Sequence, residues 1–159
     1  MNRKRIRQAV LGIILLLWAC KLLLRPSPYG RAGTWEGVTL TTDRAVYEPT
    51  ADCVSVTVST DTAEPLSAVW SPAHVREKDS HWALEKKRLG IWCSVKQAEI
   101  PLPWPDKGVV HLHDGEELRC GIGDHYASPL RPGEYRIVLP ICSYGGKNGR
   151  LAVKFAVAE

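Results

Sequence analysis

The heptapeptide Cys-Val-Ser-Val-Thr-Val-Ser at residues 53–59 alternates strictly between apolar and polar side chains. Its three valines share one face of an extended chain, and Cys53 shares the opposite face with Ser55 and Thr57. A period of two residues is typical of a β-strand that buries one face and leaves the other toward solvent. We therefore expect a strand here, with the valines in a core.

Short segments of the same kind follow one another along the chain, and residues typical of turns separate them. Further strands are predicted at residues 37–42, 66–71, 82–87, 91–95, 109–113, 118–122, 135–139 and 151–157. Strands 82–87 and 91–95 form a predicted hairpin, because Gly90 lies at the tight position between them. Short strands at this spacing, with almost no helical periodicity after the N-terminal region, predict an all-β antiparallel sandwich.

The first 25 residues differ in character from the rest of the chain. Basic residues with no acidic residue among them come first, and an almost continuous apolar run follows at residues 9–24. Such a basic cluster is typical of an export signal and of the cytoplasmic flank of a membrane span. The run covers about 24 Å as a helix, near the lower limit for crossing a bilayer, and Lys21 can reach the outer interface. Residues 1–25 are thus predicted to be a membrane anchor or a lipoprotein signal.

Residues 17–20, Leu-Trp-Ala-Cys, resemble a bacterial lipobox, in which the cysteine is acylated after cleavage. That resemblance implies Cys20 as a lipidation site. An uncleaved anchor is favoured over a lipoprotein, because Trp18 is bulky beside the cut and a Lys-Leu-Leu-Leu segment follows it. Release after cleavage is the third alternative. All three place residues 30–159 outside the cytoplasm.

The net charge of +4 belongs to the N-terminal region. Six of the 21 Lys and Arg residues lie within the first 25 positions, so that 15 remain against 17 Asp and Glu, a net charge of −2 for the rest. A protein that binds nucleic acid needs a basic face on its folded part. Nucleic acid is therefore excluded as an expected partner.

The chain after the anchor suits one domain with a substantial core. Residues 26–35 are interpreted as a linker and residues 36–159 as the domain. The domain contains four cysteines, at positions 53, 93, 120 and 142. An even number in an oxidising compartment favours two disulfides, with three possible pairings; free thiols are the alternative.

Three segments of this domain resemble a family of bacterial immunoglobulin-like domains found on exported and membrane-bound proteins, chiefly of Gram-positive bacteria. They are Gly-Val-Thr-Leu at 37–40 with Tyr-Glu-Pro at 47–49, the hairpin from Leu-Glu-Lys-Lys at 84–87 to Gly-Ile-Trp at 90–92, and Leu-Arg-Pro-Gly-Glu-Tyr-Arg-Ile-Val at 130–138. The resemblance covers residues 36–159. It implies an immunoglobulin-like antiparallel sandwich that serves as an appended, non-enzymatic module.

In this family's architecture Tyr135 occupies the place of a tyrosine corner, with a ring buried at the start of the penultimate strand and a hydroxyl available to backbone two layers away. Ile137 stands where an antibody domain has its second cysteine, so the antibody-type bridge between sheets is missing. The sandwich topology favours a surface disulfide between Cys53 and Cys120, because the start of strand 53–59 should lie beside the end of strand 118–122. Cys93 with Cys142 then follows by remainder.

His111 and His113 are the strongest candidates for a metal site, since side chains two residues apart on a strand point the same way. Asp124, His125, Glu116 and Glu117 are possible further ligands. The alternative is that both histidines simply occupy the solvent face, opposite Leu112. We find no serine in a strained Gly-x-Ser-x-Gly turn and no cysteine with a positioned histidine, so neither catalysis nor a cofactor is expected.

Trp92 and Trp104 are candidates for an exposed aromatic surface that binds peptide or glycan, because prolines surround Trp104 and aromatic rings give a large contact area. The alternative is that they fill the core, as expected for Trp70 and Trp82. The sequence thus predicts a non-enzymatic, membrane-tethered, extracytoplasmic module of a bacterial cell envelope, whose partner is an envelope protein or a cell-wall ligand. A metal-handling protein that uses His111, His113 and His125 is the second hypothesis, and a purely structural or stalk role without a saturable partner is the third.

Overall fold

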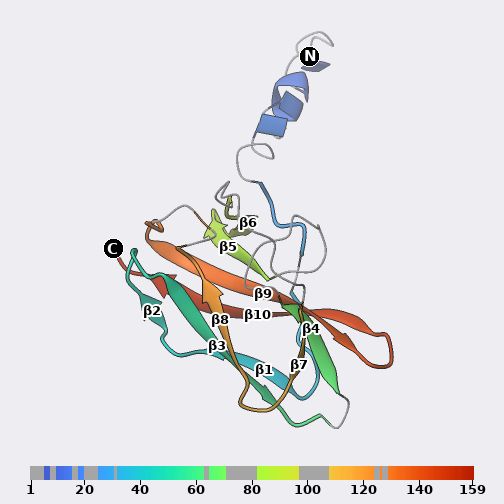
Figure 1. Cartoon of the computed structure of the whole chain (residues 1–159). Coiled ribbons are helices and arrows are strands. Elements are labelled where there is room, and N and C mark those ends of the chain that lie inside the picture. Colours follow the sequence, from blue (N-terminus) through green and yellow to red (C-terminus); the bar gives the residue numbers. More distant parts are fainter. Residues whose placement is uncertain are drawn as a thin grey trace.

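The computed structural model describes residues 6–7, 10–15, 18–19, 25–30, 32–62, 65–70, 82–96, 108–123, 126 and 129–159 (Figure 1). Strands dominate this part of the chain. In order they are β1 (Val38–Thr42), β2 (Val46–Tyr47), β3 (Cys53–Thr60), β4 (Leu66–Trp70), β5 (Ala83–Arg88), β6 (Ile91–Ser94), β7 (Gly108–Leu112), β8 (Glu117–Gly121), β9 (Gly133–Ser143) and β10 (Asn148–Val157). Each strand that the sequence predicted is present, with ends that differ by a few residues.

The strands form two sheets. The first has three antiparallel strands in the order β1-β3-β8. The second has the order β2-β10-β9-β4-β7, and the β5–β6 hairpin joins it through β9. All of its pairs are antiparallel except that between β2 and β10, which is parallel. The described part of the chain is therefore mostly β, with one antiparallel and one mixed sheet, so the prediction that all strands pair antiparallel is wrong for β2.

One hydrophobic core lies between the two sheets. It includes the valines of β3, alternate residues of β9 and the inward residues of β10: Val54, Val56, Val58, Tyr135, Ile137, Leu139, Ile141, Leu151, Val153, Phe155 and Val157. Cys53, Ser55 and Thr57 are only half-buried on the other face of β3. The alternation in the sequence thus predicted correctly which face of β3 packs inward.

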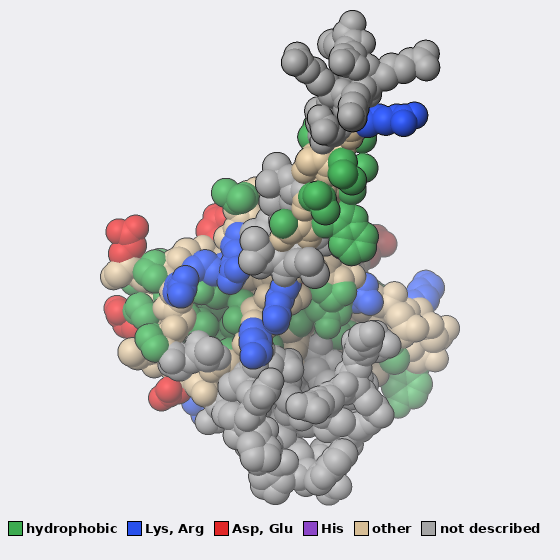
Figure 2. All heavy atoms as spheres, turned by 90° about the horizontal axis from the view of Figure 1, so that it is seen from above, with side chains coloured by type: hydrophobic (Ala, Val, Ile, Leu, Met, Phe, Trp, Pro, Cys, Tyr) green, Lys and Arg blue, Asp and Glu red, His purple; other side chains and the backbone are tan. Residues whose placement is uncertain are grey.

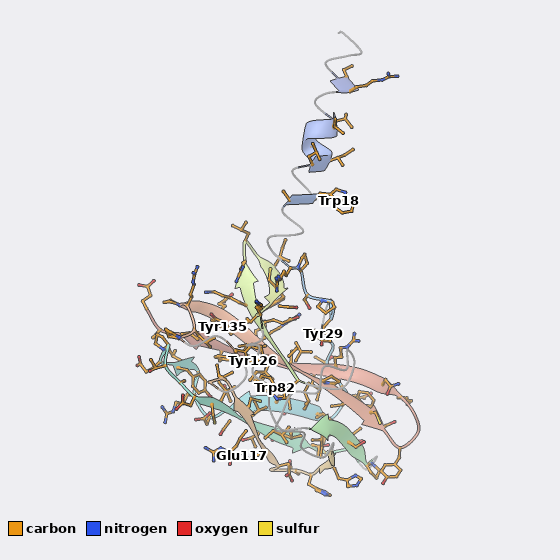
Figure 3. The ribbon with its side chains drawn as sticks, turned by 45° about the horizontal axis from the view of Figure 1, so that its top comes forward. Trp18, Tyr29, Trp82, Glu117, Tyr126 and Tyr135 are labelled. Atoms are coloured by element: carbon orange, nitrogen blue, oxygen red, sulfur yellow. The ribbon has the colours of Figure 1, made fainter. Side chains whose placement is uncertain are left out.

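Aromatic side chains fill the ends of this core. Trp82 is buried beside Tyr126, with ring centroids 5.5 Å apart, and Figure 3 shows the two lying together inside the fold. Phe155 lies between two tyrosine rings, edge-on to Tyr47 at 5.3 Å and stacked on Tyr135 at 5.7 Å. The expected core position of Trp82 is confirmed, whereas the side chain of Trp70 lies outside the described part.

Tyr135 has the buried ring predicted for it, but its hydroxyl bonds to the turn just before β9 and not to backbone two layers away. Its ring is buried, and its hydroxyl donates to the carbonyl oxygen of Arg131, four residues earlier, at 2.6 Å. Burial is the main reason that the pKa of the Tyr135 hydroxyl is raised. This bond ties the turn before β9 to the strand itself.

The β5–β6 hairpin closes through a two-residue turn. Leu89 and Gly90 have φ angles of 50° and 78°, the left-handed pair that matches the twist of a hairpin. Lys87 and Trp92 pair across the strands just below this turn. The predicted hairpin is confirmed, with the difference that Leu89, a residue that rarely adopts positive φ, shares the turn with the glycine.

β9 is buried on both faces, which its sequence pattern did not predict. It has β10 along one edge and both β4 and β5 along the other, so it is a central strand. Val138 and Arg136, on the face opposite to Tyr135, are buried as well. Part of the cover comes from the segment that leads into the domain.

Residues 25–30, the docked segment, lie against the fold instead of hanging free as a linker. Ser27 donates its backbone N–H to the carbonyl of Trp92 at 2.9 Å, and Ser94 donates to the carbonyl of Arg25 at 3.0 Å. Arg136 Nη2 donates to the carbonyl of Gly30 at 3.0 Å. The docked segment thus extends the β5–β6 hairpin by a short length of chain, and then passes over β9.

Helical residues before this segment are found at 6–7, 10–15 and 18–19. Within the described residues, no helix is long and apolar enough to cross a membrane. Cys20, the possible lipidation site, lies outside the described part. The membrane anchor and its acylation therefore stay predictions.

Cys53, Cys93, Cys120 and Cys142 are free thiols in the structure, so neither predicted disulfide is present in it. Cys93 pairs with Lys86, and Lys86 with Tyr135 of β9; Cys142 lies seven residues farther along β9, about 23 Å away. A disulfide between Cys93 and Cys142 is incompatible with this distance.

Cys53 and Cys120 do lie side by side on β3 and β8, as predicted, but on opposite faces of the sheet. Cys53 is opposite Gly121, and Cys120 is opposite the core residue Val54. Cys120 is therefore buried, and a bridge along the surface does not form in this arrangement.

Candidate functional site

Two adjoining hollows lie at the end of the fold where β3 ends and the turns after β7 and β9 meet. The Trp35 hollow, of about 630 Å³, is lined by Thr34, Trp35, Glu36, Gly37, Asp61, Thr62, Lys147 and Asn148. The His111 hollow, of about 490 Å³, is lined by Thr60, Thr62, Pro65, Leu66, His111, Leu112, His113, Asp114 and Tyr144. Thr62 lines both, so the two hollows form one continuous surface.

This surface faces away from the N-terminal segment. The β7–β8 turn lies at the bottom of Figure 1 and the β9–β10 turn at its right, whereas the N-terminal helix is at the top. In Figure 3, Glu117 at the start of β8 and Trp18 of the N-terminal helix mark the two opposite ends. A ligand in the hollows would therefore approach from the side opposite the predicted anchor.

A tight turn at residues 35–38 builds the first hollow. Val38 donates its backbone N–H to the carbonyl of Trp35 at 3.0 Å, and Gly37 has a φ of 74°. A side chain at position 37 would also meet the Asp61 carboxylate, because an added Cβ would lie 2.2 Å from Asp61 Oδ1. Glycine at position 37 thus allows the carboxylate of Asp61 to lie against the backbone of the turn.

The ring of Trp35 rests against the backbone of β10. A Cβ added at Gly149 would lie 2.6 Å from the ring, so the glycine provides the space that the indole occupies. Trp35 stays partly exposed. Acidic, basic and amide side chains of Glu36, Asp61, Lys147 and Asn148 surround it. An aromatic surface ringed by hydrogen-bonding groups suits a polar ligand with apolar faces, such as a sugar or a peptide.

The second hollow has an exposed aromatic pair at its rim. The rings of His111 and Tyr144 are stacked, with centroids 6.1 Å apart and planes at 22°. Asp114 also lines this hollow, and its Oδ1 accepts the backbone N–H of Thr60 at 2.9 Å. That bond fixes the β7–β8 turn against the end of β3.

His111 and His113 line the same hollow and are both exposed, while Leu112 between them is buried. The orientation predicted for the two histidines is thus confirmed. Among the described residues, however, no group of three His, Cys, Asp or Glu side chains is placed to hold a metal ion. Asp124 and His125 lie outside the described part.

Trp92 is half-buried and does not form an open shelf. The Arg136 guanidinium lies over its ring, 4.6 Å from the centroid, and Lys87 Nζ lies at 5.9 Å. Trp104 lies outside the described residues. Trp35 was not among the binding residues predicted from the sequence, although Gly37 just before a strand is a turn signal that marks this place.

No protein-family model matches this chain, and the search of curated proteins gave no match.

Proposed function

We propose that this chain is a non-enzymatic, membrane-tethered, extracytoplasmic binding or accessory module of a bacterial cell envelope, with an immunoglobulin-like sandwich as its fold. The two sheets around one core and the Tyr135 hydroxyl bond support the fold assignment. The basic and apolar N-terminal sequence supports the tether.

The observation that carries the binding role is the continuous surface of the Trp35 and His111 hollows. It combines exposed aromatic rings with charged and amide groups, and it lies on the side opposite the N-terminal segment. Loops at one end of a rigid sheet scaffold are the usual place for contacts with a partner. The partner is an envelope protein or a cell-wall ligand that approaches from outside the membrane.

The test is crosslinking on intact producing cells, with a photoreactive amino acid in place of Tyr144 and a tag at the C-terminus. Lys154, an exposed residue of β10, carries the same probe as the matched control. We expect one dominant product from position 144 that is absent from position 154, identified by mass spectrometry. Equal or no products at the two positions would contradict the proposal. The mass of the purified chain also shows whether Cys20 has been cleaved and acylated.

Metal handling is the second candidate, because both histidines line one hollow. Metal analysis after native purification, compared with a His111→Ala/His113→Ala double variant, separates the two candidates. If the purified protein never retains metal, the metal-handling candidate is wrong.

A further inference from the structure

The tip of the β5–β6 hairpin exposes apolar side chains that the fold does not use. Leu89 is 89% exposed and Ile91 is 48% exposed. Leu89 also adopts a φ of 50°, a conformation that asparagine or glycine would adopt with less strain. Neither packing nor turn geometry therefore accounts for a leucine at this position.

The docked segment places this tip next to the N-terminal region. Ser94 donates to the carbonyl of Arg25, the last residue of the predicted anchor, and Gly90 lies four residues away along β6, about 13 Å. In Figure 3 the hairpin points to the same side of the molecule as the helix that carries Trp18. A tip so placed is close to the surface of any bilayer that holds the N-terminal segment.

The same region carries more positive charge than its two glutamates can neutralise. Both glutamates already have a basic partner, Glu134 with Lys87 at 2.6 Å and Glu85 with Arg136 at 2.6 Å. Arg88, beside the tip, is exposed. Figure 2 shows Lys and Arg side chains around the base of the N-terminal segment, whereas most of the Asp and Glu side chains in this view lie toward its left edge.

Lys86 lies among like charges beside the tip. Its ammonium donates to the carbonyls of Arg131 and Pro132, at 3.0 and 2.7 Å. Burial lowers the pKa of Lys86, and the positive charges of Arg88 and Arg131 lower it further. Anionic lipid headgroups would offset this repulsion, since basic groups near a membrane surface are attracted to them.

We propose that the tip of the β5–β6 hairpin docks on the bilayer, with Leu89 and Ile91 in the headgroup layer and Arg88 on anionic headgroups. This inference rests on the proposed membrane tether. Its consequence is a fixed orientation: the docked segment and the tip hold the domain at two points, so that the Trp35 and His111 hollows face away from the membrane.

The experiment uses the full chain in vesicles of phosphatidylcholine, with or without phosphatidylglycerol. A photoreactive phenylalanine derivative replaces Leu89 in one sample and Val46, an exposed residue at the other edge of the sheet, in a second. Flotation reports the tether, and lipid adducts found by mass spectrometry report the docking. In the anionic vesicles we expect about tenfold more adduct at position 89 than at position 46, as the transfer of one leucine side chain from water would give.

Three outcomes overturn the inference, and they are distinguishable. If the chain floats with the vesicles but gives no more lipid adduct at position 89 than at position 46, the docking is wrong and the tether is still supported. Equal adduct with and without phosphatidylglycerol removes the contact with anionic headgroups. If the chain does not float with the vesicles, both the proposed tether and the proposed docking are wrong.

A substitution provides an independent check that does not depend on the probe. Leu89→Asn fits the left-handed conformation, so the hairpin keeps its turn while the tip loses its apolar side chain. With the probe at Ile91, we expect Leu89→Asn to lower lipid adducts about tenfold and Val46→Thr to leave them unchanged. Unchanged adducts in Leu89→Asn would contradict the proposal.

Discussion

Arg136 and Glu85 form an ion pair inside the fold, with Nε of the arginine 2.6 Å from Oε2 of the glutamate and side chains that are 6% and 0% exposed. The guanidinium also donates to Gly30 and stacks on Trp92, so one side chain connects β9, β5, β6 and the docked segment. Glu85 Oε1 has no hydrogen-bond partner among the described residues. The carboxylate therefore depends on Arg136.

Replacement of Arg136 by methionine should strongly destabilise the protein. The Glu85 carboxylate would then be buried without its partner, and loss of one member of a buried pair costs about 3–5 kcal/mol. Urea unfolding followed by tryptophan fluorescence measures this change in the free energy of unfolding. The double variant Glu85→Leu/Arg136→Met is the control, and we expect it to recover most of the loss. A loss below about 1 kcal/mol in Arg136→Met would mean that water reaches the carboxylate.

Tyr135→Phe removes the hydroxyl that bonds to the Arg131 carbonyl and leaves the ring in place. We expect a loss of about 1 kcal/mol in the free energy of unfolding, the usual net contribution of one such hydrogen bond. Tyr144→Phe is the matched control, because Tyr144 is 73% exposed. Equal effects of the two substitutions would show that the Tyr135 bond does not stabilise the turn before β9.

Gly149→Ala should displace the Trp35 ring, since the new Cβ would lie 2.6 Å from it. We expect a loss of about 1–3 kcal/mol in unfolding free energy, as for other overpacked sites. The yield of the crosslinked product from a probe at position 144 should fall as well, because the Trp35 hollow loses its aromatic surface. Gly33→Ala is the control, for its added Cβ meets only ordinary contact at 3.8 Å. Wild-type stability in Gly149→Ala would place Trp35 elsewhere in solution.

The four thiols should react with an alkylating reagent in an order set by burial. Cys142 is exposed and should react first, whereas Cys120 should react last because burial raises the pKa of its thiol. Peptide mapping after timed alkylation measures this order. A non-reducing map that joins Cys53 to Cys120 would instead mean that the backbone near residues 121–123 shifts on oxidation.

The raised pKa of Cys120 also predicts how stability changes with pH. Above the ordinary thiol pKa, about 8.5, the unfolded chain loses a proton that the folded protein keeps, so the free energy of unfolding falls as the pH rises. Below that pH this thiol makes no difference. Cys120→Ala should remove the part of this fall in unfolding free energy that is due to the thiol, between about pH 8 and pH 10. Urea unfolding at a series of pH values measures it. An identical pH profile for the variant would contradict the assignment.

The sequence predicted local structure well where one rule operates at a time. Alternation located β3 and its buried valines, Gly90 located the hairpin, and the position of Tyr135 indicated its buried ring. It did not predict that β9 is covered on both faces, because Arg136 and Val138 become buried only through chain far away in the sequence. Proximity in space also decides which thiols are neighbours, and an even cysteine count carries no such information.

What the sequence by itself determined is the class of fold and the division of the chain into a basic, apolar N-terminal region and an acidic β-rich remainder. These follow from periodicity and composition, which are local properties. Only the tertiary structure decided where a ligand surface lies. Trp35, Asp61, Lys147 and Tyr144 come from three separate turns, and the sheet registers bring those turns to one end. Register depends on the packing of whole faces against each other, so no short segment encodes it.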